Sequence, residues 1–357
     1  MKRYKIAILK NEHPQDYKLW IDSCKKRSDE VEYSVIDLSQ NDWFEKISSL
    51  KFDAFLAKPP GLTNSFKQLY DEKIAIINDL FPYKLYPTVS EINIYENKRR
   101  LSFWLKANNI PHPKTDVFYS KEEAINFIKV CSFPFVAKLN IGASGKGVTI
   151  IKDATEGMKY IEEIFTTGRS PKTGPNLKKG KLFKRLIKKL LNPSQLQERL
   201  FTYRSIKNDI QVGYVIVQEY IPHNFEWRVV KIGDSYFAHK KITVDGKASG
   251  SLKKGYDNPP IDILSFVKDI TDKHNFFSQA VDIFQTGNNE YLVNEMQCIF
   301  GQSDEHQMYV DGEPGRYYFN NNMWFFEKGS FCTNQCFDLR LEYVINKLKQ
   351  NNENPFC

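Results

Sequence analysis

The sequence predicts an α/β protein that begins with a small parallel sheet and continues as a longer, mixed α+β part. Over the first 90 residues, short apolar runs alternate with polar helical stretches, which is typical of a parallel sheet covered by helices. Beyond residue 91, strands follow one another through short turns and glycine-containing loops. The 357 residues, of which 41% are apolar, are sufficient for two or three packed domains.

The first domain is expected to span residues 1–90, as a small open parallel α/β sheet. The expected strands are 4–9, 31–38 and 52–58, and the expected helices are 15–26, 41–50 and 65–80. Pro59, Pro60 and Gly61 follow the third strand directly and end it.

The second domain is expected to span residues 91–215 and to begin with a helix at 96–109. Leu101, Trp104 and Leu105 lie along one face of that helix, and the asparagines and prolines of NIPHPKT end it. After a helix at 121–130, two strands at 133–139 and 147–153 enclose a run of glycines, so this segment predicts a hairpin with a flexible tip.

The third domain is expected to span residues 216–357. The expected strands that form it or lead into it are 213–221, 226–234, 235–244, 279–284 and 290–298, and the expected helices are about 262–274 and 337–350.

The formal charge of +8 is concentrated in one segment, residues 168–213. This segment contains twelve Lys and Arg and two acidic residues, Glu198 and Asp209. Its net charge is therefore +10, and that of the remaining residues is 8 − 10 = −2. Within it, residues 181–191 (KLFKRLIKKLL) predict a helix with one apolar and one basic face. This helix either packs on its own protein, or docks on an anionic membrane surface or partner. Nucleic acid is not expected, because the segment lacks interleaved aromatic residues.

Targeting and membrane segments are not expected. The apolar run near the N-terminus, Ile6 to Leu9, is too short for a signal peptide, and no stretch approaches the roughly 20 apolar residues of a membrane span. The six cysteines are scattered and predict free thiols rather than a disulfide framework. We therefore expect a cytoplasmic protein.

The glycine run, KLNIGASGKGV at 138–148, indicates a phosphate-binding loop. Gly142, Gly145 and Gly147 allow close approach of the backbone to a ligand. Only two residues separate Gly142 from the Gly145-Lys146 pair, so the run is not a Walker loop, and its glycines do not match G-x-G-x-x-G. Lys138 ends a strand that is expected to be buried, where a lysine needs an anionic partner.

A second group of polar residues indicates a metal site. Asp282 and Glu295 lie on two adjacent strands joined by a turn, and Gln297 lies two residues beyond Glu295 on the same face. A divalent cation would hold both carboxylates ionised, and two carboxylates with an amide oxygen suit Mg²⁺.

These motifs together resemble those of the ATP-grasp enzymes, which include D-alanine–D-alanine ligase and glutathione synthetase. The resemblance covers residues from about 91 to 302, and the segments that carry it are ENKRRL, NIPHPKT, FVAKLNIGASGKGV, VQEYI, EWRVV and VDIFQTGNNEYLVNEMQCIFG. It implies two α+β subdomains that clasp ATP, preceded by the α/β domain.

The resemblance also implies a role for individual residues. Phosphate-binding and lid residues would be Lys98, Lys138, Gly142, Ser144, Gly145 and Gly147; adenine contacts would be Gln218 and the backbone of Glu219, Tyr220 and Ile221. Glu226 stands where an Asp is more usual, and Arg228 matches the arginine of that motif. The metal ligands for one or two Mg²⁺ ions, or for Mn²⁺ as an alternative, would be Asp282, Glu295 and Gln297, with Gln297 in place of the more common Asn.

The reaction that the resemblance implies joins a carboxylate to an amine. The carboxylate would attack the γ-phosphate of ATP to give an acylphosphate, and the amine would then displace phosphate. Arg228 and Lys240 would assist the transfer, while Lys240, Lys241, Ser251 and Lys254 are either substrate contacts or a solvated strand end and loop.

The substrates are left open by the sequence. The acid is expected to be an amino acid, a peptide or a sugar acid of a cell-surface polymer, and residues 301–318, with His306 and Arg316, are candidates for the acceptor site. Two other functions are compatible with the sequence: a small-molecule kinase that stops after phosphoryl transfer, and a non-catalytic ATP-binding module.

Overall fold

The computed structural model describes residues 3–142, 145–171, 193–243 and 253–357. The chain divides into two compact units. The first unit comprises Met1–Pro60, Gln68–Pro113 and Ile221–Cys357, and the second comprises Gly61–Lys67 and Lys114–Tyr220. The helix that begins at Lys98 therefore belongs with the two ends of the chain, whereas the glycine hairpin lies in the second unit. The three-part division at residues 90 and 215 stays a prediction.

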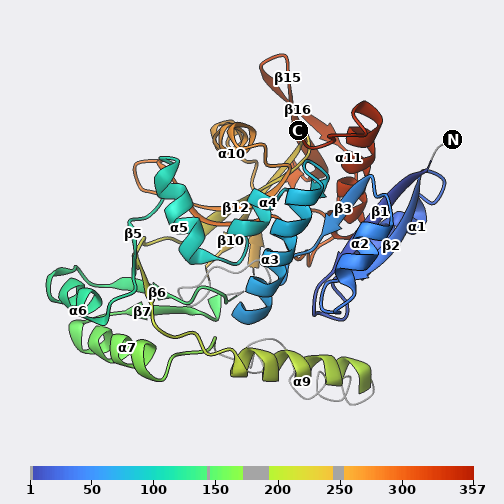
Figure 1. Cartoon of the computed structure of the whole chain (residues 1–357). Helices are drawn as coiled ribbons and strands as arrows, with labels where there is room; N and C mark the ends of the chain where they lie inside the picture. The colour runs from blue at the N-terminus through green and yellow to red at the C-terminus, as the bar shows by residue number, and fades with distance from the viewer. Residues whose placement is uncertain (1–2, 143–144, 172–192, 244–252) are drawn as a thin grey trace. The chain divides into compact units, whose positions relative to one another are not determined.

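The N-terminal sheet of the first unit is parallel, which confirms the fold predicted for this segment (Figure 1). Its strand order is β2-β1-β3-β4, with β1 at Tyr4–Lys10, β2 at Val31–Asp37, β3 at Ala54–Ala57 and β4 at Leu85–Tyr86. The helices that follow the first three strands are α1 (Lys18–Lys26), α2 (Trp43–Ser49) and α3 (Asn64–Leu80). Strand β4 was not expected, because two residues give no periodicity to recognise.

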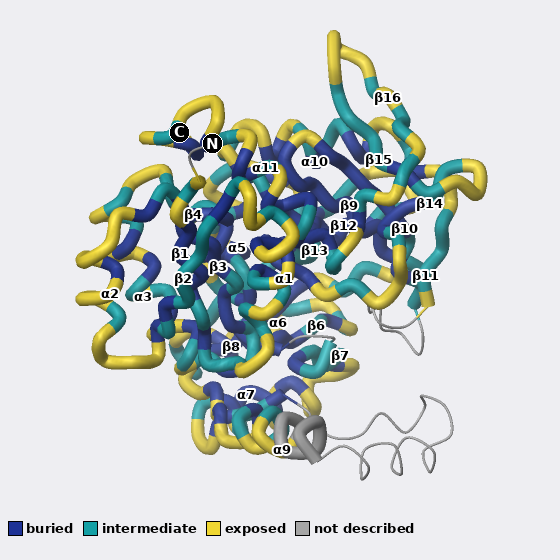
Figure 2. Tube along the Cα trace, turned by 90° about the vertical axis from the view of Figure 1, so that its right-hand side faces the viewer, coloured by how far each residue is buried: buried dark blue, intermediate teal, exposed yellow. Residues whose placement is uncertain are grey.

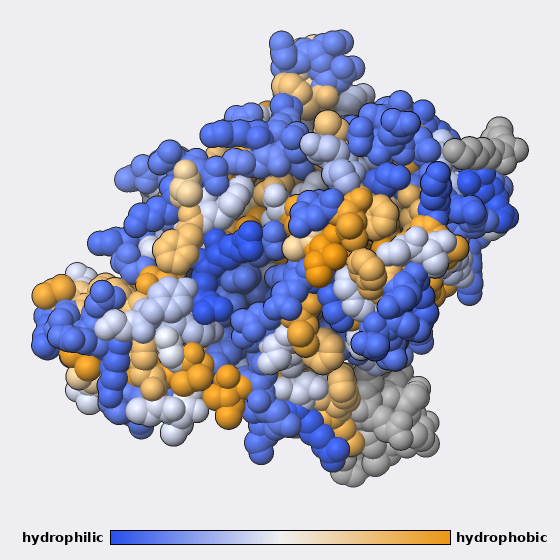
Figure 3. Space-filling view, in the orientation of Figure 1, coloured by the Kyte–Doolittle hydropathy of each residue, from blue (hydrophilic) through white to orange (hydrophobic). Residues whose placement is uncertain are grey.

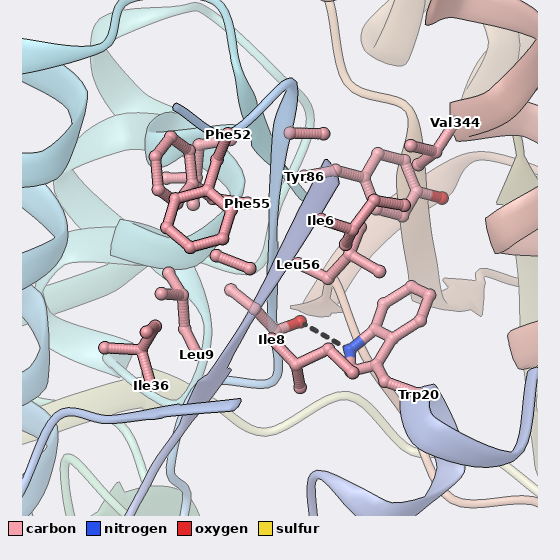
Figure 4. Close-up of a cluster of buried hydrophobic side chains, with 14 of the residues drawn as sticks. Ile6, Ile8, Leu9, Trp20, Ile36, Phe52, Phe55, Leu56, Tyr86 and Val344 are labelled. Atoms are coloured by element: carbon pink, nitrogen blue, oxygen red, sulfur yellow. Dashed lines mark hydrogen bonds between the residues drawn. The ribbon is translucent and has the colours of Figure 1, made fainter. Parts of the chain in front are cut away.

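The C-terminal helix α11 (Phe337–Gln350) completes the core of the N-terminal sheet (Figure 4). Trp20 of α1 is fully buried, and its indole N–H donates to the Ala57 carbonyl at 3.3 Å. The Phe337 ring meets the Trp20 ring edge-on, with 4.7 Å between centroids. A buried tryptophan with a satisfied N–H combines a large apolar area with a polar anchor. Two ends of the chain are thereby joined in one core.

A second, eight-stranded sheet forms the remainder of the first unit. Its order is β13-β12-β9-β10-β15-β14, with β11 paired to β10 and β16 to β15, and all neighbours are antiparallel. The strands are β9 (Phe225–Ile232), β10 (Ser235–Ile242), β11 (Lys253–Gly255), β12 (Ser278–Gln285), β13 (Tyr291–Gln297), β14 (Tyr309–Val310), β15 (Glu313–Asn320) and β16 (Met323–Lys328). The accompanying helices are α4 (Val89–Ile94), α5 (Lys98–Ala107) and α10 (Ile261–Lys273).

One face of this sheet is apolar and packs against helices. Trp227 and Val229 of β9 and Val281 of β12 share a core with Leu101 of α5 and Val267 of α10. Because side chains alternate along a strand, the residues between them point to the opposite face. That opposite face carries the polar residues described below.

The second unit has a four-stranded antiparallel sheet of order β5-β8-β6-β7. Its strands are β5 (Thr115–Phe118), β6 (Phe135–Lys138), β7 (Val148–Ile151) and β8 (Val215–Glu219), and its helices include α6 (Lys121–Val130), α7 (Ala154–Thr166) and α9 (Pro193–Asn208). The predicted hairpin around the glycine run is confirmed, with Lys138 opposite Val148. Helix α9 begins at Pro193, and proline is well tolerated at a first helical position. The basic helix predicted at 181–191 lies outside the described residues.

The surface is hydrophilic over most of the face seen in Figure 3, with apolar residues in separate groups. Buried residues follow the central strands, and exposed residues follow the outer sides of the helices (Figure 2). Among the described helices, none has the length and apolar character that a bilayer crossing requires. All six cysteines are free, as predicted.

Candidate functional site

A buried group of charged side chains lies on the polar face of the eight-stranded sheet. The strand register places Asp282 of β12 opposite Arg228 of β9 on one side and opposite Glu295 of β13 on the other. Arg228 donates to both oxygens of Asp282, from Nε at 2.8 Å and from Nη2 at 2.9 Å. Such bidentate pairs fix geometry as well as charge. The Asp282 carboxylate is only 1% exposed, so this pair is a buried one.

Lys241 of β10 joins a second carboxylate to this pair. Its Nζ donates to Asp282 Oδ2 and to Glu226 Oε2, each at 2.7 Å. Glu226 also accepts a hydrogen bond from Asn294 Nδ2 at 3.1 Å. Burial by itself would raise the pKa of Asp282, but Arg228 and Lys241 hold that pKa well below its usual range. Two cations and two carboxylates thus form a compensated buried network.

Lys98, at the start of α5, lies between two further carboxylates. Its Nζ is 3.6 Å from Glu96 Oε2 and 3.6 Å from Glu295 Oε1, and the nitrogen is buried without a hydrogen-bond partner among the described residues. Burial would lower the pKa of Lys98, but Glu96 and Glu295 outweigh this effect and raise it. Glu96 has a φ of 45°, a conformation that costs free energy outside glycine. The ammonium group is therefore charged, and its N–H donors could bind a ligand.

Gln297 connects the two groups. Its Oε1 accepts from Arg228 Nη2 at 3.3 Å, and its Nε2 donates to Glu96 Oε1 at 3.4 Å. The structure therefore brings together, within the first unit, most of the residues predicted there: Lys98, Glu226, Arg228, Lys241, Asp282, Glu295 and Gln297.

Lys240 does not belong to this group, and its predicted catalytic role stays a prediction. Neighbouring residues of a strand point to opposite faces. The Lys240 Nζ lies 4.4 Å from the Phe225 ring centre and 5.0 Å from that of Trp227, and it donates to Asp257 at 2.5 Å. The adjacent Lys241 lies in the charged network instead.

The glycine hairpin of the second unit is a tight backbone turn. Leu139 N–H donates to the Gly147 carbonyl at 2.9 Å and closes its base. A Cβ at Gly142 would lie 2.9 Å from both the Cα and the nitrogen of Gly147, closer than side-chain carbons come. Gly145 has a φ of 69°, which glycine adopts readily. Lys138 is 9% exposed at the end of β6. Ser144 lies outside the described residues.

Gln211 and Tyr214 hold this hairpin by side-chain hydrogen bonds, which no sequence motif indicated. Gln211 Nε2 donates to the Ile141 carbonyl at 3.1 Å, and Ile141 N–H donates to Gln211 Oε1 at 3.3 Å. Tyr214 OH donates to the same Oε1 at 2.6 Å and accepts from Asn140 N–H at 3.2 Å. The backbone before Gly142 is thereby fixed.

The predicted adenine contacts lie at the end of β8. Gln218 is buried, and its Nε2 donates to Thr115 Oγ1 at 3.1 Å. The N–H of Glu219 already donates to the Lys114 carbonyl at 2.8 Å, so it is not free for a ligand. Tyr220 and Ile221 follow the strand, and their contact role stays a prediction.

The predicted acceptor segment has a mixed outcome. Arg316 Nε and Nη2 pair with Glu327 at 2.8 Å, while Nη1 donates to Ser235 Oγ at 2.9 Å. Arg316 therefore links β15 to β16 and β10. Lys254 Nζ lies 2.9 Å from Asp304 and is mostly buried, so it is not part of a solvated strand end. His306 lies beside the Tyr309 ring, and its Nδ1 has no partner among the described residues.

Glu12 is an unusual residue that the sequence analysis missed. It lies in the loop after β1, where Asn11 Nδ2 donates to the Lys58 carbonyl that follows β3, at 2.7 Å. Both carboxylate oxygens are buried and receive no hydrogen bond from another described residue. Burial raises the pKa of Glu12 to about 7, and Asp16 adds to the shift. A charged residue directly after a buried strand was the available signal, because open α/β sheets bind ligands at this end.

Glu12 is expected to make the protein less stable as the pH rises from about 4.5 to about 7. The folded state keeps a proton that the unfolded state has lost over this range, so its loss costs up to about 3 kcal/mol. Urea unfolding should therefore find Glu12→Gln more stable than the wild type at pH 8 and equal to it near pH 4.5. Glu45→Gln, at an exposed position of α2, is the matched control. Parallel pH curves for Glu12→Gln and the wild type would contradict this expectation.

The comparisons with known proteins identify the fold. Residues 97–177 match the family model described as phosphoribosylglycinamide synthetase, ATP-grasp (A) domain. The structure resembles D-cycloserine synthetase DcsG at 13% identity, over 96% of this chain and 99% of that one, with a TM-score of 0.56. It also resembles D-alanine–D-alanine ligase from Bacillus anthracis at 15% identity, over 84% and 88% of the chains, with a TM-score of 0.51.

A third structure, N5-carboxyaminoimidazole synthetase from Staphylococcus aureus complexed with ADP, is 13% identical over 84% of this chain and 72% of that one, with a TM-score of 0.54. No curated protein sequence gives a significant match. The protein therefore has the ATP-grasp fold. The resemblance to this superfamily that the sequence motifs indicated is confirmed.

Proposed function

We propose that the protein is an ATP-dependent ligase that joins a carboxylate to an amine through an acylphosphate. The observation that carries the proposal is the buried group of Arg228, Lys241 and Lys98 around Asp282 and Glu295, on one face of a sheet in an ATP-grasp fold. Cations and dipoles fixed around a transferring phosphoryl group are what this chemistry requires. Proteins of this fold named above are ligases or synthetases, one of them complexed with ADP.

Each unit, taken by itself, contains residues that suit a nucleotide. In the first unit, the Lys98 Nζ is buried and makes no hydrogen bond to a described residue, so it has donors for phosphate oxygens. In the second unit, Gly142 packs so closely on the Gly147 backbone that a side chain would not fit there, and a glycine loop of this kind suits an anion. Lys138 at the base of the hairpin would add a positive charge, and Gly145 would contact the phosphates. Gln218, Tyr220 and Ile221 would contact the adenine.

The donor chemistry also fits Mg²⁺. Asp282 and Glu295 are register partners, and among the described residues Asp282 Oδ1 accepts one hydrogen bond, which leaves it a second lone pair. Gln297 offers an amide oxygen beside them. The described residues contain no group of three His, Cys, Asp or Glu that could hold a metal, so the ion would also need water and phosphate oxygens. When bound, it would neutralise phosphate charge.

In this proposal, the three buried cations of the network have different roles. Arg228 and Lys241 are fixed by Asp282 and Glu226, and they would stabilise negative charge that grows on the phosphoryl oxygens as the substrate carboxylate attacks. Lys98 would hold the phosphates in line. The network lies in a buried face of low dielectric, where each charge acts more strongly than in water. The acid would be an amino acid, a peptide or a sugar acid, including one linked to a cell-surface polymer.

An assay with ATP, Mg²⁺ and pools of amino acids and sugar acids tests this function. We expect ADP and free phosphate only when an acid and an amine are both present. ADP with a stable phosphorylated product would identify a kinase instead. ATP binding without turnover in every mixture would favour a non-catalytic module.

A further inference from the structure

Two buried hydrogen-bond acceptors lie close to the charged network and are not used by it. His239 of β10 is fully buried, and its Nδ1–H donates to the Gln307 carbonyl at 2.9 Å, so its Nε2 carries the lone pair. Gln307 is 1% exposed, and its Nε2 donates to Gln302 Oε1 at 3.1 Å. No described residue donates to His239 Nε2 or to Gln307 Oε1. A buried acceptor without a donor loses its hydrogen bond to water and gains none, so two of them call for an explanation.

The position of the pair connects it to the proposed reaction. His239 is the register partner of Arg228, and strand alternation places it on the same face as Lys241. The Tyr256 ring lies 6.0 Å from the His239 ring, and Tyr256 OH donates to Asp304 at 2.6 Å. Asp304 and Gln307 belong to the segment that follows β13, which carries Glu295.

The segment that presents Gln307 is firmly held. Gln302 Nε2 donates to the carbonyls of Asp304 and Glu305, at 2.8 and 2.9 Å, and more weakly to that of Cys332 at 3.2 Å. Lys254 Nζ pairs with Asp304 from the other side, at 2.9 Å. The two acceptors are therefore preorganised, and a ligand would not have to order them.

The chemistry of the pair selects its ligand. Two acceptors without donors require a group that brings N–H or O–H hydrogens. Burial, followed by the charges of Lys254 and Arg228, lowers the pKa of His239 to about 3, so the imidazole stays neutral. The same positive charges disfavour a second cation at this place and favour an uncharged donor group.

We propose that His239 Nε2 and Gln307 Oε1 accept hydrogen bonds from the N–H groups of the second substrate's amine and hold that amine uncharged. This inference rests on the proposed ligase function, in which an amine attacks the acylphosphate. Only an uncharged amine has the lone pair that this attack needs. His239 and Gln307 then bind and orient the nucleophile, whereas Arg228 and Lys241 act on the phosphoryl group.

Two substitutions of His239 in the full-length protein test the proposal. His239→Asn keeps an amide nitrogen near the position of Nδ1 and removes the Nε2 acceptor, whereas His239→Gln places an amide oxygen near the position of Nε2. With the acid pool of the preceding assay and hydroxylamine as the amine probe, hydroxamate formation is measured against the concentration of each substrate. We expect His239→Asn to raise the KM for hydroxylamine about tenfold, with the KM for ATP within twofold of the wild type, and His239→Gln to recover part of the loss.

The outcomes distinguish a failure of the amine-binding proposal from a failure of the ligase function. An unchanged hydroxylamine KM in His239→Asn would overturn it, and so would an equal loss for ATP and hydroxylamine in both variants. Should His239→Asn fail to fold, Gln307→Met removes the other acceptor at similar volume, and the same rise in the hydroxylamine KM is expected. If the wild type forms no hydroxamate with any acid, the ligase function itself is wrong, and the inference fails with it.

Discussion

Asp282→Ala and Glu295→Ala are expected to abolish Mg²⁺-dependent ATP turnover alike, but to differ sharply in stability. Asp282→Ala should lower the free energy of unfolding by about 3–5 kcal/mol, because it leaves two buried cations, Arg228 and Lys241, without their shared carboxylate. Glu295→Ala should cost no more than about 1 kcal/mol. Its side chain is 25% exposed, and its contact with Lys98 is 3.6 Å long.

The contrast between the two variants separates fold from function. Asp282 has two tasks in our proposal, as the partner of buried cations and as a metal ligand, so its variant alone could not distinguish them. Glu295 contributes little to stability. A folded Glu295→Ala protein without turnover would therefore show that Glu295 is needed for the reaction itself. Urea unfolding gives the stabilities, and ATP turnover over a range of Mg²⁺ concentrations gives the activities.

Asp257→Ala is the matched control for these carboxylates. Asp257 pairs with Lys240 on the other face of the sheet and is 65% exposed, so both its stability and its turnover should stay close to those of the wild type. Full turnover in Glu295→Ala would show that the metal assignment is wrong. A loss of less than about 1 kcal/mol in Asp282→Ala would contradict the buried network.

The sequence predicts those parts of the site that are formed by elements adjacent to one another along the chain. The hairpin between 133–139 and 147–153 follows from two strands and the glycines between them, and Asp282 and Glu295 become neighbours through one short turn. The small parallel sheet likewise follows from regular alternation of strands and helices. In each case the partner is the next element in the sequence.

Whether Lys240 or Lys241 lies on the face of the charged network depends on strand register. Lys240 and Lys241 are adjacent, and a shift of one residue exchanges their faces. The turn between β9 and β10 contains Gly233, whose φ of 55° favours glycine, and a Cβ there would lie 2.2 Å from the Tyr343 ring.

Long-range polar contacts could not be predicted either. The hydrogen bond between His239 and Gln307 joins residues 68 positions apart in the sequence, and that between Gln211 and Ile141 joins residues 70 positions apart. A lone glutamine or histidine in a sequence carries no signal of its partner, since such residues are common on surfaces. Glu226 was visible only as a departure from the usual Asp, and the structure gives it two partners, Lys241 and Asn294.

Lys98→Met is expected to weaken ATP binding about 10- to 100-fold, the loss typical of a hydrogen bond to a charged group. The Lys98 Nζ is buried 3.6 Å from both Glu96 and Glu295 and makes no hydrogen bond of normal length to a described residue, so it can donate to a phosphate. The methionine side chain keeps the length and apolar stem of lysine and removes only the charge. Calorimetric titration with ATP measures the effect, and Lys106→Met, exposed on the same helix, is the control.

The same substitution also tests whether Lys98 serves the nucleotide or only its neighbouring carboxylates. The folded-state pKa of Lys98 is raised, so its contribution to stability is complete at pH 7 and is lost only as the pH rises through that pKa. Without the lysine, Glu96 and Glu295 lose the cation between them, and the variant should be less stable at pH 7 than at pH 5. Unchanged ATP affinity with this new pH dependence would mean that Lys98 only compensates the carboxylates. A large loss of affinity at pH 5, where this destabilisation is weaker, would assign the donors of Lys98 to phosphate.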